Sequence, residues 1–550
     1  MKKIRKFILN MALLLMVFSF AYSAWAEEYT LFGKEISLDG FFRQEFSFCT
    51  ARQSSYHNNQ SGLDAAYQMW LVDTNLVLSP NLEIRMILRE WGDLYYYMRD
   101  GNSQFEHYFQ GGLSHAAWDR QWDQILREIY ATYSNERMLV RVGRQQIAWG
   151  ESDGLRLMDI INPLDARRMF LFYDTEGYEE VRIPKFMVKT EFYGGSFWKF
   201  SDTSLEFIWN PGDVPRFGEL LGNLNETDLC GGKMYPGHFP KGTTNHWSPW
   251  AFPINWAPFP VRLRTDEKKF KISNSEFGGR VKFSFKNTFI TLNYWQGFNA
   301  ESLILKYRGL LPDPVGRQAP PAIPAALNFD KVQPRIRIAG FTLNRELFGV
   351  GPLTCQTANP VLRMEALYAF RQPFNAHLQD VGSGRVLPIV HYDQIRYMIG
   401  FDWNMGIPFI NPTKNTFVSA QFFHIKTLNY RGDEMAPKPV PLYNYKQPAD
   451  QFYSTILLKT DYMNEKVCPS FLMVWDHSCN AAWAKPTLDF KIGNHWRPQI
   501  GYLWIKANSS RYETVFDPIT EKSYRVADDW KSFGTFENRD QAWVRIEYQF

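Results

Sequence analysis

The chain has 550 residues, with 61 Lys and Arg against 57 Asp and Glu, and aromatic side chains make up 17% of it. Residues 1–26 carry four basic and no acidic side chains, so the remainder is formally neutral. This balance excludes the strong basic excess that is typical of nucleic-acid-binding proteins. The mean hydropathy of −0.35 and the absence of a second apolar run near 18 residues exclude helical membrane spans after the N-terminus.

The first 26 residues have the pattern of a secretory signal peptide. A basic start from Lys2 to Lys6 precedes an apolar stretch over about 7–22, and Ala24-Trp25-Ala26 forms a small-x-small cleavage site. An uncleaved helical anchor is the alternative. We therefore expect a signal peptide at 1–26 and a single exported domain at 27–550.

Alternating segments recur along the rest of the chain. In residues 276–286, Val281 and Phe283 fall on one face of an extended segment, whereas Arg280 and Lys282 fall on the other. Segments of 9–13 residues of this kind are joined alternately by tight polar turns and by long irregular stretches. Outer-membrane β-barrels show this alternation, because their periplasmic turns are short and their outer loops are long.

The segments number about eighteen, with sixteen as the nearest even alternative. They predict an all-β, antiparallel, up-and-down transmembrane barrel with long extracellular loops. The predicted strands are 34–48, 67–78, 82–91, 125–133, 138–149, 183–194, 203–209, 276–286, 288–297, 333–343, 360–372, 394–404, 415–427, 452–462, 466–476, 485–493, 499–507 and 540–550. The predicted tight turns are 79–81, 134–137, 286–287 and 463–466.

The last residues, 541–550, keep the alternation up to the carboxylate. Phe550, Tyr548 and Ile546 share one face, and Arg545 and Glu547 share the other. This pattern predicts a closing strand that meets lipid with its aromatic face and pairs with 34–48. The terminal Phe550, with Tyr548 and Ile546, also resembles the C-terminal signal that barrel-assembly machinery recognises. A soluble, secreted β-protein remains an alternative.

Catalytic and metal motifs are missing from the sequence. The chain has no GxSxG, no HExxH and no CxxC, so no enzyme, metal site or cofactor is expected. His477 and Ser478 are adjacent, and adjacent residues of a strand point to opposite faces. Cys468 and Cys479 flank an expected strand of up to roughly 35 Å, too far apart to form a disulfide with each other.

Residues 126–168 hold the most information. They begin as a hairpin, and Gly143 then breaks the phase, so that Arg144 falls where an apolar residue is due. A glycine within a strand often marks a bulge or a close backbone approach. The stretch from Trp149 to Asp159 is predicted to form a helical or looped insertion, which "INPLD" ends as a turn.

This stretch resembles the signature of an uncharacterised outer-membrane barrel family of proteobacteria, domain of unknown function 1302, which is porin-like. The motifs that carry the resemblance are Val142-Gly143-Arg144-Gln145, Trp149-Gly150-Glu151 and Asn162-Pro163 with Asp165. The resemblance implies an outer-membrane barrel with outer-membrane lipids and barrel-assembly machinery as partners. It also implies a transport system with a periplasmic carrier and an inner-membrane transporter.

Charged residues are expected to line the lumen, because a Lys or Arg on the lipid face costs roughly 2–4 kcal/mol at the midplane. Such a basic face would bias a pore toward anions, or its members would form ladders with carboxylates. The residues expected to line the lumen or a constriction are Arg141, Arg144, Glu151, Asp153, Arg156, Asp159, Arg280, Lys282, Arg363 and Arg396. The lumen face is further expected to carry Arg43, Arg85, Arg89, Arg335, Arg337, Arg371 and Arg545, with Asp39, Glu45, Glu83, Glu365, Asp402 and Glu547 as its acidic members.

The expected function is that of a porin-like channel or the outer-membrane component of a transport system in a Gram-negative bacterium. The solute would be anionic or lipid-like. A barrel with a plugged lumen and a role in binding or assembly is the alternative.

Overall fold

The structure is a computed structural model of the whole chain. It describes residues 29–31, 33–50, 62–94, 125–164, 179–214, 233–234, 261–265, 270–299, 304–312, 325–349, 359–375, 389–431, 447–506, 512–517, 522–527 and 540–550. The expected signal peptide at 1–26 and the motif residue Asp165 lie outside this part of the chain.

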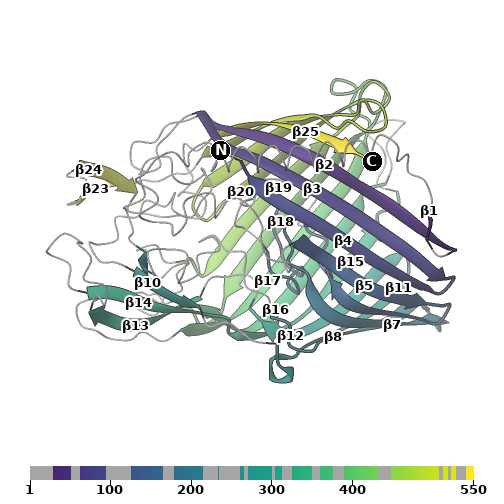
Figure 1. Cartoon of the computed structure of the whole chain (residues 1–550), viewed down its shortest axis with the longest axis horizontal. Helices are drawn as coiled ribbons and strands as arrows, with labels where there is room; N and C mark the ends of the chain where they lie inside the picture. The colour runs from purple at the N-terminus through teal and green to yellow at the C-terminus, as the bar shows by residue number, and fades with distance from the viewer. Residues whose placement is uncertain are drawn as a thin grey trace.

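Eighteen strands form one closed antiparallel ring, in which each strand pairs with the next one along the chain (Figure 1). The number of strands and their antiparallel order confirm the predicted fold. The ring consists of β2 (Lys34–Cys49), β3 (Gly62–Ser79), β4 (Leu82–Asp93), β5 (Leu126–Ser134), β6 (Met138–Gln145), β7 (Lys185–Phe197), β8 (Phe200–Asn210), β11 (Glu276–Phe285), β12 (Thr288–Phe298), β15 (Arg335–Glu346), β16 (Val361–Phe374), β17 (Val390–Met405), β18 (Thr416–Thr427), β19 (Asp450–Lys459), β20 (Val467–Asp476), β21 (Ala481–Phe490), β22 (Gln499–Lys506) and β25 (Gln541–Gln549).

The ring closes where the first long strand meets the last one. β2 pairs with β25 from Phe41 opposite Gln549 to Cys49 opposite Gln541, as the alternation of the last strand predicts. Closure leaves no free edge, so the backbone groups of both terminal strands find partners. The terminal residue takes part as well, since the backbone N–H and C=O of Phe550 exchange hydrogen bonds of 3.0 and 3.1 Å with Gly40.

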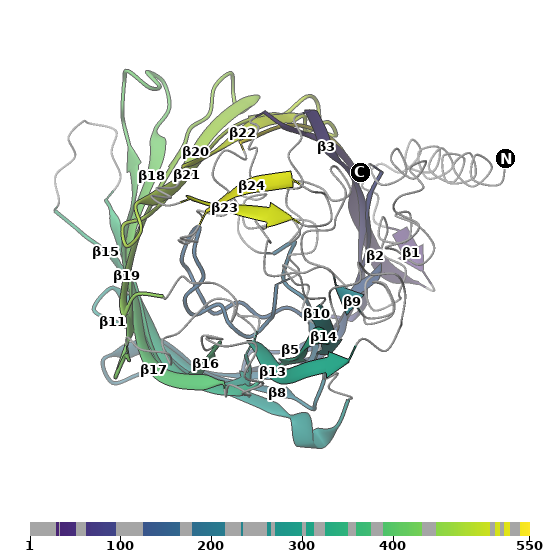
Figure 2. The same cartoon turned by 90° about the vertical axis from the view of Figure 1, so that its left-hand side faces the viewer.

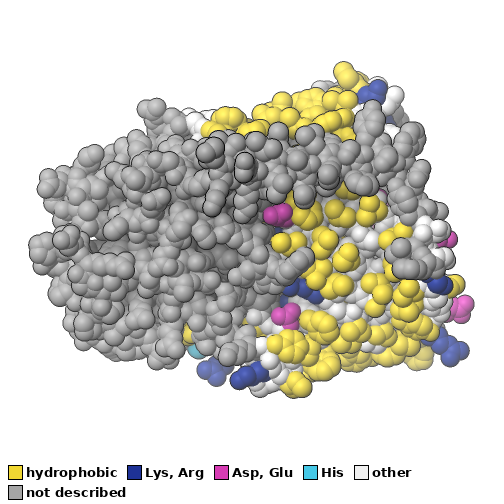
Figure 3. All heavy atoms as spheres, in the orientation of Figure 1, with side chains coloured by type: hydrophobic (Ala, Val, Ile, Leu, Met, Phe, Trp, Pro, Cys, Tyr) yellow, Lys and Arg dark blue, Asp and Glu magenta, His cyan; other side chains and the backbone are white. Residues whose placement is uncertain are grey.

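The outer wall is apolar. Phe207 of β8 is 49% exposed and Ile500 of β22 is 52% exposed, although both belong to strands of the ring, and many other large apolar side chains share this face. Figure 3 shows hydrophobic side chains over the visible, described part of the wall, with charged side chains mainly toward its borders. A soluble β-sandwich would bury such faces between its sheets. An apolar face turned outward around a closed ring is instead the pattern of a barrel in lipid.

The tight turns expected from the sequence all lie at one end of the ring, and the longest connections lie at the other. The turns expected at 79–81, 134–137, 286–287 and 463–466 each join two neighbouring strands. The long connections also contain strands that the sequence did not reveal, and these lie beyond the loop end in Figure 1. They are β13 (Ile304–Pro312), β14 (Ala325–Val332), β10 (Val261–Thr265) and β9 (Lys233–Met234) in one sheet, and β23 (Tyr512–Asp517) with β24 (Lys522–Ala527) in another. The short β1 (Tyr29–Leu31) pairs with the start of β2.

Three arginines expected in the lumen lie outside it. Arg335 and Arg337 share a face of β15 with the exposed Phe341, whereas Ile336 and Ile338 on the other face are buried. Arg371 is exposed at a register shift in β16, with φ +51°. All three lie near the loop ends of their strands, where an outward charge costs only about 0–1 kcal/mol.

Two further observations concern helices and cysteines. Within the described residues, no helix is long and apolar enough to cross a bilayer. No disulfide joins Cys468 to Cys479, which confirms the prediction for this pair.

The contact at the closing seam gives a first prediction. A Cβ atom on Gly40 would lie 2.6 Å from the Phe550 ring and 2.4 Å from the Leu71 carbonyl oxygen. We expect Gly40→Val to destabilise the barrel by about 1–3 kcal/mol, as overpacking does, and to lower the temperature at which the heat-modifiable gel band converts. Gly279→Val is the matched control, because the only atom near its Cβ position is 3.9 Å away. Equal conversion temperatures for both variants would refute a packed seam.

Candidate functional site

One connection turns into the ring instead of leaving it. After β6 the chain enters the lumen as residues 146–164, here called the inward segment, and residues 179–184, here called the return arm, lead back to β7. Figure 2 looks along the ring and shows this part of the chain, in slate blue, inside the wall of strands. It adopts an irregular loop without a helix, which was one of the two forms expected for this insertion.

The entry point explains the Gly-Arg-Gln motif. Gly143 has φ +139°, and a Cβ there would lie 2.2 Å from the Ile129 carbonyl oxygen, so the motif needs glycine for a close backbone approach. Of the two interpretations of this glycine, the close backbone approach is therefore correct and the bulge is not, because β6 keeps an unshifted register with β5 and with β7. Gln145 is fully buried, and its side-chain amide donates to the Met187 carbonyl at 2.9 Å. It is the last residue of β6, so this strand ends four residues earlier than the predicted 138–149.

The Asn-Pro motif fastens the two ends of the insertion together. The side-chain oxygen of Asn162 accepts the backbone N–H of Ile147 at 2.9 Å. Its side-chain nitrogen donates to the Ile183 carbonyl at 2.8 Å. Pro163 adds a third tie, since its carbonyl accepts the N–H of Ile183 at 2.7 Å. One buried amide therefore holds the start of the inward segment next to the return arm.

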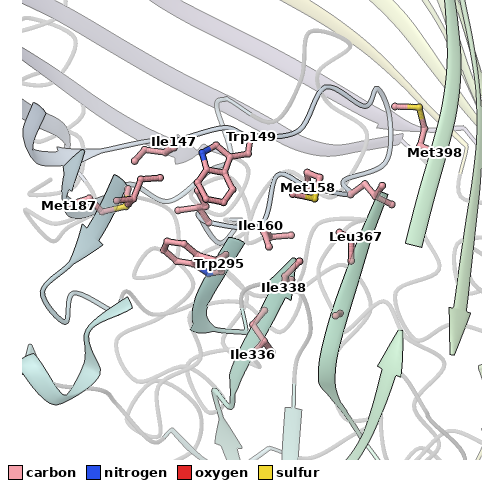
Figure 4. Close-up of a cluster of buried hydrophobic side chains, with 14 of the residues drawn as sticks. Ile147, Trp149, Met158, Ile160, Met187, Trp295, Ile336, Ile338, Leu367 and Met398 are labelled. Carbon is pink, nitrogen blue, oxygen red and sulfur yellow. The ribbon is translucent and has the colours of Figure 1, made fainter. Parts of the chain in front are cut away.

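An apolar cluster seats the inward segment on the wall (Figure 4). Trp149 lies edge-on to Trp295 of β12, with ring centroids 6.3 Å apart, and both lie over Gly278. Met158 lies similarly close to Gly340. The remaining buried members are Ile147, Leu157, Ile160 and Ile161 from the segment, and Met187, Ile208, Ile336, Ile338, Leu367, Ala369, Met398 and Phe423 from the wall.

Two buried wall carboxylates bind the segment directly. Glu365 of β16 is 1% exposed and accepts the backbone N–H groups of Glu151 and Met158, the latter at 3.1 Å. Glu206 of β8 accepts the indole N–H of Trp149 at 2.7 Å. Because a buried carboxylate needs partners, the wall and the segment satisfy each other.

The middle of the inward segment, around residues 151–154, reaches the opposite wall. Arg363 of β16 donates to the Glu151 carbonyl and pairs with Asp153, and Asp153 exchanges two hydrogen bonds with Gln421 of β18, at 2.7 and 2.9 Å. Next to it, the Cβ position of Gly154 is 3.3 Å from Val474 of β20. Since β20 lies nearly half a turn around the ring from β6, the segment crosses the lumen.

The return arm is held by arginines of the wall near the closing seam. The Glu180 carboxylate accepts Arg43 at 2.9 Å. Arg89 donates to the Glu180 carbonyl, and Arg127 donates to the Glu179 carbonyl. Burial alone would raise the pKa of Glu180, but the charge and hydrogen bond of Arg43, with Arg545 and Arg89 nearby, lower it from its ordinary 4.5 to about 2.

Ion pairs rather than free basic groups cover much of the lumen wall. Lys282 lies 2.8 Å from Glu191 and 3.1 Å from Glu206, and Lys189 lies 3.2 Å from Glu206. Two further pairs are Lys185 with Glu276 at 2.7 Å and Arg545 with Glu45 at 2.8 Å. Of the two arrangements expected for the charges of the lumen wall, these residues form ladders of basic and acidic side chains, and not an unpaired basic surface.

The structure brings most of the predicted constriction residues together. Glu151, Asp153, Arg156 and Asp159 belong to the inward segment, and Asp159 binds Arg182 of the return arm at 2.8 Å. Arg156 donates to the Asn162 carbonyl at 2.8 Å. On the inward face of the wall lie Arg141, Arg280, Lys282, Arg363 and Arg396.

Arg144 is a correction, because it does not face the lumen. Its partners across the sheet are Ile129 on β5 and Phe186 on β7, which are both exposed on the outer wall. It is the penultimate residue of β6, at the loop end, where an outward charge is cheap.

Several residues of this site were not predicted. Glu206, Gln421 and Glu180 carry no signal in their own strands or loops, because their partners are distant in sequence. Glu365 was expected on the lumen face, although its bonds to the segment were not. Asn162 belongs to the motif that carries the family resemblance, and the motif was the available sign of its importance.

Among the described residues, no group of three or more His, Cys, Asp or Glu side chains could hold a metal ion. A closed ring with an apolar outer wall and a charged interior defines a transmembrane β-barrel of the outer-membrane type.

The chain belongs to the family described as a protein of unknown function, DUF1302, which matches residues 8–550. This membership confirms the resemblance inferred from the Gly-Arg-Gln and Asn-Pro motifs. Among curated proteins, no sequence is similar enough to count as a relative.

Solved structures resemble the chain only distantly. OccAB3 of Acinetobacter baumannii is 9% identical with a TM-score of 0.42, and the match covers 94% of this chain and 99% of that chain. OccAB1 of the same organism is 8% identical with a TM-score of 0.44, covering 94% and 96%. The outer membrane protein OpdK of Pseudomonas aeruginosa is 8% identical with a TM-score of 0.41, covering 94% and 98%.

The anchoring by Glu365 can be tested by hydrogen exchange. In Glu365→Gln one acceptor oxygen becomes an N–H donor that faces a backbone N–H, and an unmatched buried donor costs about 1–3 kcal/mol. We expect the amides of Glu151 and Met158 to exchange roughly tenfold or more faster. Glu83→Gln is the control, because Glu83 also faces the lumen but bonds Asn75 on the neighbouring strand. Unchanged exchange in Glu365→Gln would show that the segment does not depend on this carboxylate.

The anchoring by Glu180 predicts a pH dependence. The pKa of this carboxyl is lower in the folded protein than its ordinary 4.5, so its contribution to stability is complete above about 4.5 and is lost as the pH falls toward about 2. We expect exchange protection of residues 181–184 to fall over this interval in the wild type. In Glu180→Gln protection should be low throughout, with no such step. An identical pH profile for both proteins would contradict the anchoring role.

Proposed function

We propose that the protein is an outer-membrane channel whose passage is set by the inward segment. The observation that carries this proposal is the path of residues 146–164, which runs from β6 across the lumen to the wall at β20 inside a closed ring. A ring of eighteen strands without such a segment would be wide enough for an aqueous passage. The segment therefore determines how much of that width remains.

Charge within the lumen also fits a channel. Charged side chains face inward on many strands, as a water-exposed lumen requires, and they are largely paired with one another. Pairing reduces the net field along the passage. The anion preference that an unpaired basic wall would give is therefore weaker than the sequence suggested.

A plugged barrel with a binding or assembly role is the second candidate. Its support is the density of anchors on the inward segment, which include Glu206, Glu365, Arg363 and Gln421. A segment held at so many points resembles a fixed plug more than a mobile one. The two candidates differ in whether the wild-type protein conducts.

Export through a signal peptide at 1–26 and insertion by barrel-assembly machinery are part of the same proposal. The last strand, β25, supports it, because its Ile546 and Tyr548 lie on the outer face and Phe550 directly follows it. A periplasmic carrier and an inner-membrane transporter remain proposed partners on the strength of the family resemblance.

Shortening the inward segment tests the channel. The Cβ position of Gly150 is 2.8 Å from the backbone nitrogen of Asp159, so residues 151–158 can be deleted and the two ends joined directly. We expect single-channel conductance in planar bilayers to rise about twofold or more, because the part that crosses the lumen is gone. Glu83→Gln, which leaves the segment intact, should conduct like the wild type.

The outcomes separate the candidates. Conductance in both proteins supports the channel, whereas conductance only after the deletion identifies a plug. If neither protein shows conductance steps, the lumen is not a passage even without residues 151–158. This result would exclude both the open channel and a channel that the inward segment plugs. Heat-modifiable gel mobility must be retained, which shows that the shortened barrel still folds.

A further inference from the structure

We propose that Arg337 of β15 and Arg371 of β16 bind the phosphate of a lipid headgroup in the outer leaflet of the membrane. Both side chains are exposed and face away from the lumen, so they are here called the outward arginine pair. The proposed channel does not require such a site. The inference therefore goes beyond the proposed function and does not depend on it.

The outward arginine pair lies at the level where lipid headgroups meet the barrel. Along β15, Ala339 lies two residues from Arg337 on the same face, and it pairs with Tyr294 of β12 and Tyr368 of β16. Tyrosines on the outer face of a barrel mark the boundary between hydrocarbon and headgroups. Phe341, two residues further from the loop end, belongs to the exposed apolar wall. Because the long loops of such barrels lie outside the cell, the headgroups at this level belong to the outer leaflet.

A register shift brings Arg371 to the outer wall next to Arg337. Phe370 and Arg371 together stand opposite Asp393, because the pairing of β16 with β17 shifts at this point. Arg371 has φ +51°, which residues other than glycine rarely adopt, and its backbone N–H donates to the Asp393 carboxylate at 2.7 Å. Arg337 pairs with Phe370, and its Cζ atom lies 5.8 Å from the centroid of that ring. Two arginines from neighbouring strands thus share one exposed surface.

The positive charge of this surface is not balanced by the described residues. Asp393 lies close enough to interact with the charges of both arginines. Its oxygens accept the Arg371 backbone N–H and the Tyr368 hydroxyl, each at 2.7 Å, and the described contacts include no ion pair between it and either guanidinium. Arg335, two residues before Arg337 on the same face, donates to two backbone carbonyls near the start of β11. Three positive charges therefore stand against one negative charge.

A phosphate group fits this excess of positive charge. Guanidinium groups bind phosphate oxygens through paired, directed N–H groups, so two neighbouring arginines can hold one phosphate together. Basic clusters next to the hydrocarbon also attract anionic lipids.

The position of the outward arginine pair favours a lipid over a soluble anion. The exposed apolar side chains of Leu292, Phe341 and Ile395 belong to the outer wall on the three strands beside the pair. The acyl chains of a lipid remove this apolar surface from water, which stabilises the complex. A soluble anion gains nothing from it. The surface therefore matches a molecule with a phosphorylated head and apolar chains.

Binding of lipid A, which carries two phosphates, tests the inference. Lipid A is added to the detergent-solubilised, full-length protein, and the bound molecules are counted by native mass spectrometry. We expect Arg337→Gln combined with Arg371→Gln to weaken lipid A binding at least about tenfold, because the charge-assisted hydrogen bonds to phosphate are lost. Heat-modifiable gel mobility shows that the variant is folded.

Arg345→Gln is the matched control. Arg345 lies on the same face of β15 and is also exposed, but it stands at the turn end, opposite Thr288. This variant should bind lipid A like the wild type. An equal loss of affinity in Arg345→Gln would mean that any outward arginine attracts the anionic lipid, which overturns the outward arginine pair as a site.

Asp393→Asn should change the affinity in the opposite direction. It removes the negative charge next to the two guanidinium groups and keeps an oxygen that accepts the Arg371 N–H. We expect lipid A to bind up to about fivefold more tightly, as the loss of an exposed charge interaction allows. A gain of this kind is not explained by a damaged fold, and the absence of any gain would contradict a headgroup placed over the pair.

Two other outcomes would also overturn the inference. Displacement of lipid A by millimolar inorganic phosphate would show a site for free anions instead of a lipid. An unchanged lipid A affinity of the double variant, together with a change in its oligomeric state by light scattering, would assign the face to a second copy of the chain. Because lipid binding is measured without conduction, these failures are distinguishable from the failure of the channel.

Discussion

The whole structure depends on the requirement that every backbone N–H and C=O group in lipid has a partner. Hydrocarbon supplies none, so a sheet in a membrane must close on itself. Here closure joins β2 to β25, strands at opposite ends of the chain. The ring then fixes one face of each strand outward and the other inward, and Gly40 gives the terminal Phe550 the space to complete the seam.

A closed ring also places many charged side chains on the inward faces of its strands. Within the wall, ion pairs such as Lys185 with Glu276 neutralise these charges. The inward segment and the return arm supply further partners, since Arg363 binds Asp153 and Arg43 binds Glu180. The loop inside the barrel is thus an electrostatic part of the wall, so changes to its carboxylates are expected to alter both stability and passage.

The strands were predictable because two local signals agree along most of the chain. Apolar and polar residues that alternate with a period of two indicate a strand, and a tight polar turn such as 286–287 marks where the strand ends. The assignment of faces failed at Arg335 and Arg337, where Ile336 and Ile338 were the buried neighbours. An apolar residue normally marks the lipid face, but these isoleucines pack against the inward segment, so both faces of the strand have apolar members.

By itself, the sequence determined the positions of most strands, their antiparallel order and the orientation of the last one, and it gave their number as about eighteen, because each of these follows from local alternation and turns. It also contained the motif around Gly143 and Asn162, although not its purpose. Only the tertiary structure decided that this motif sends a segment across the lumen and that Glu180 meets Arg43, 137 residues away. Such pairs depend on the register around the ring and on the path of a loop through its interior, which no local pattern encodes.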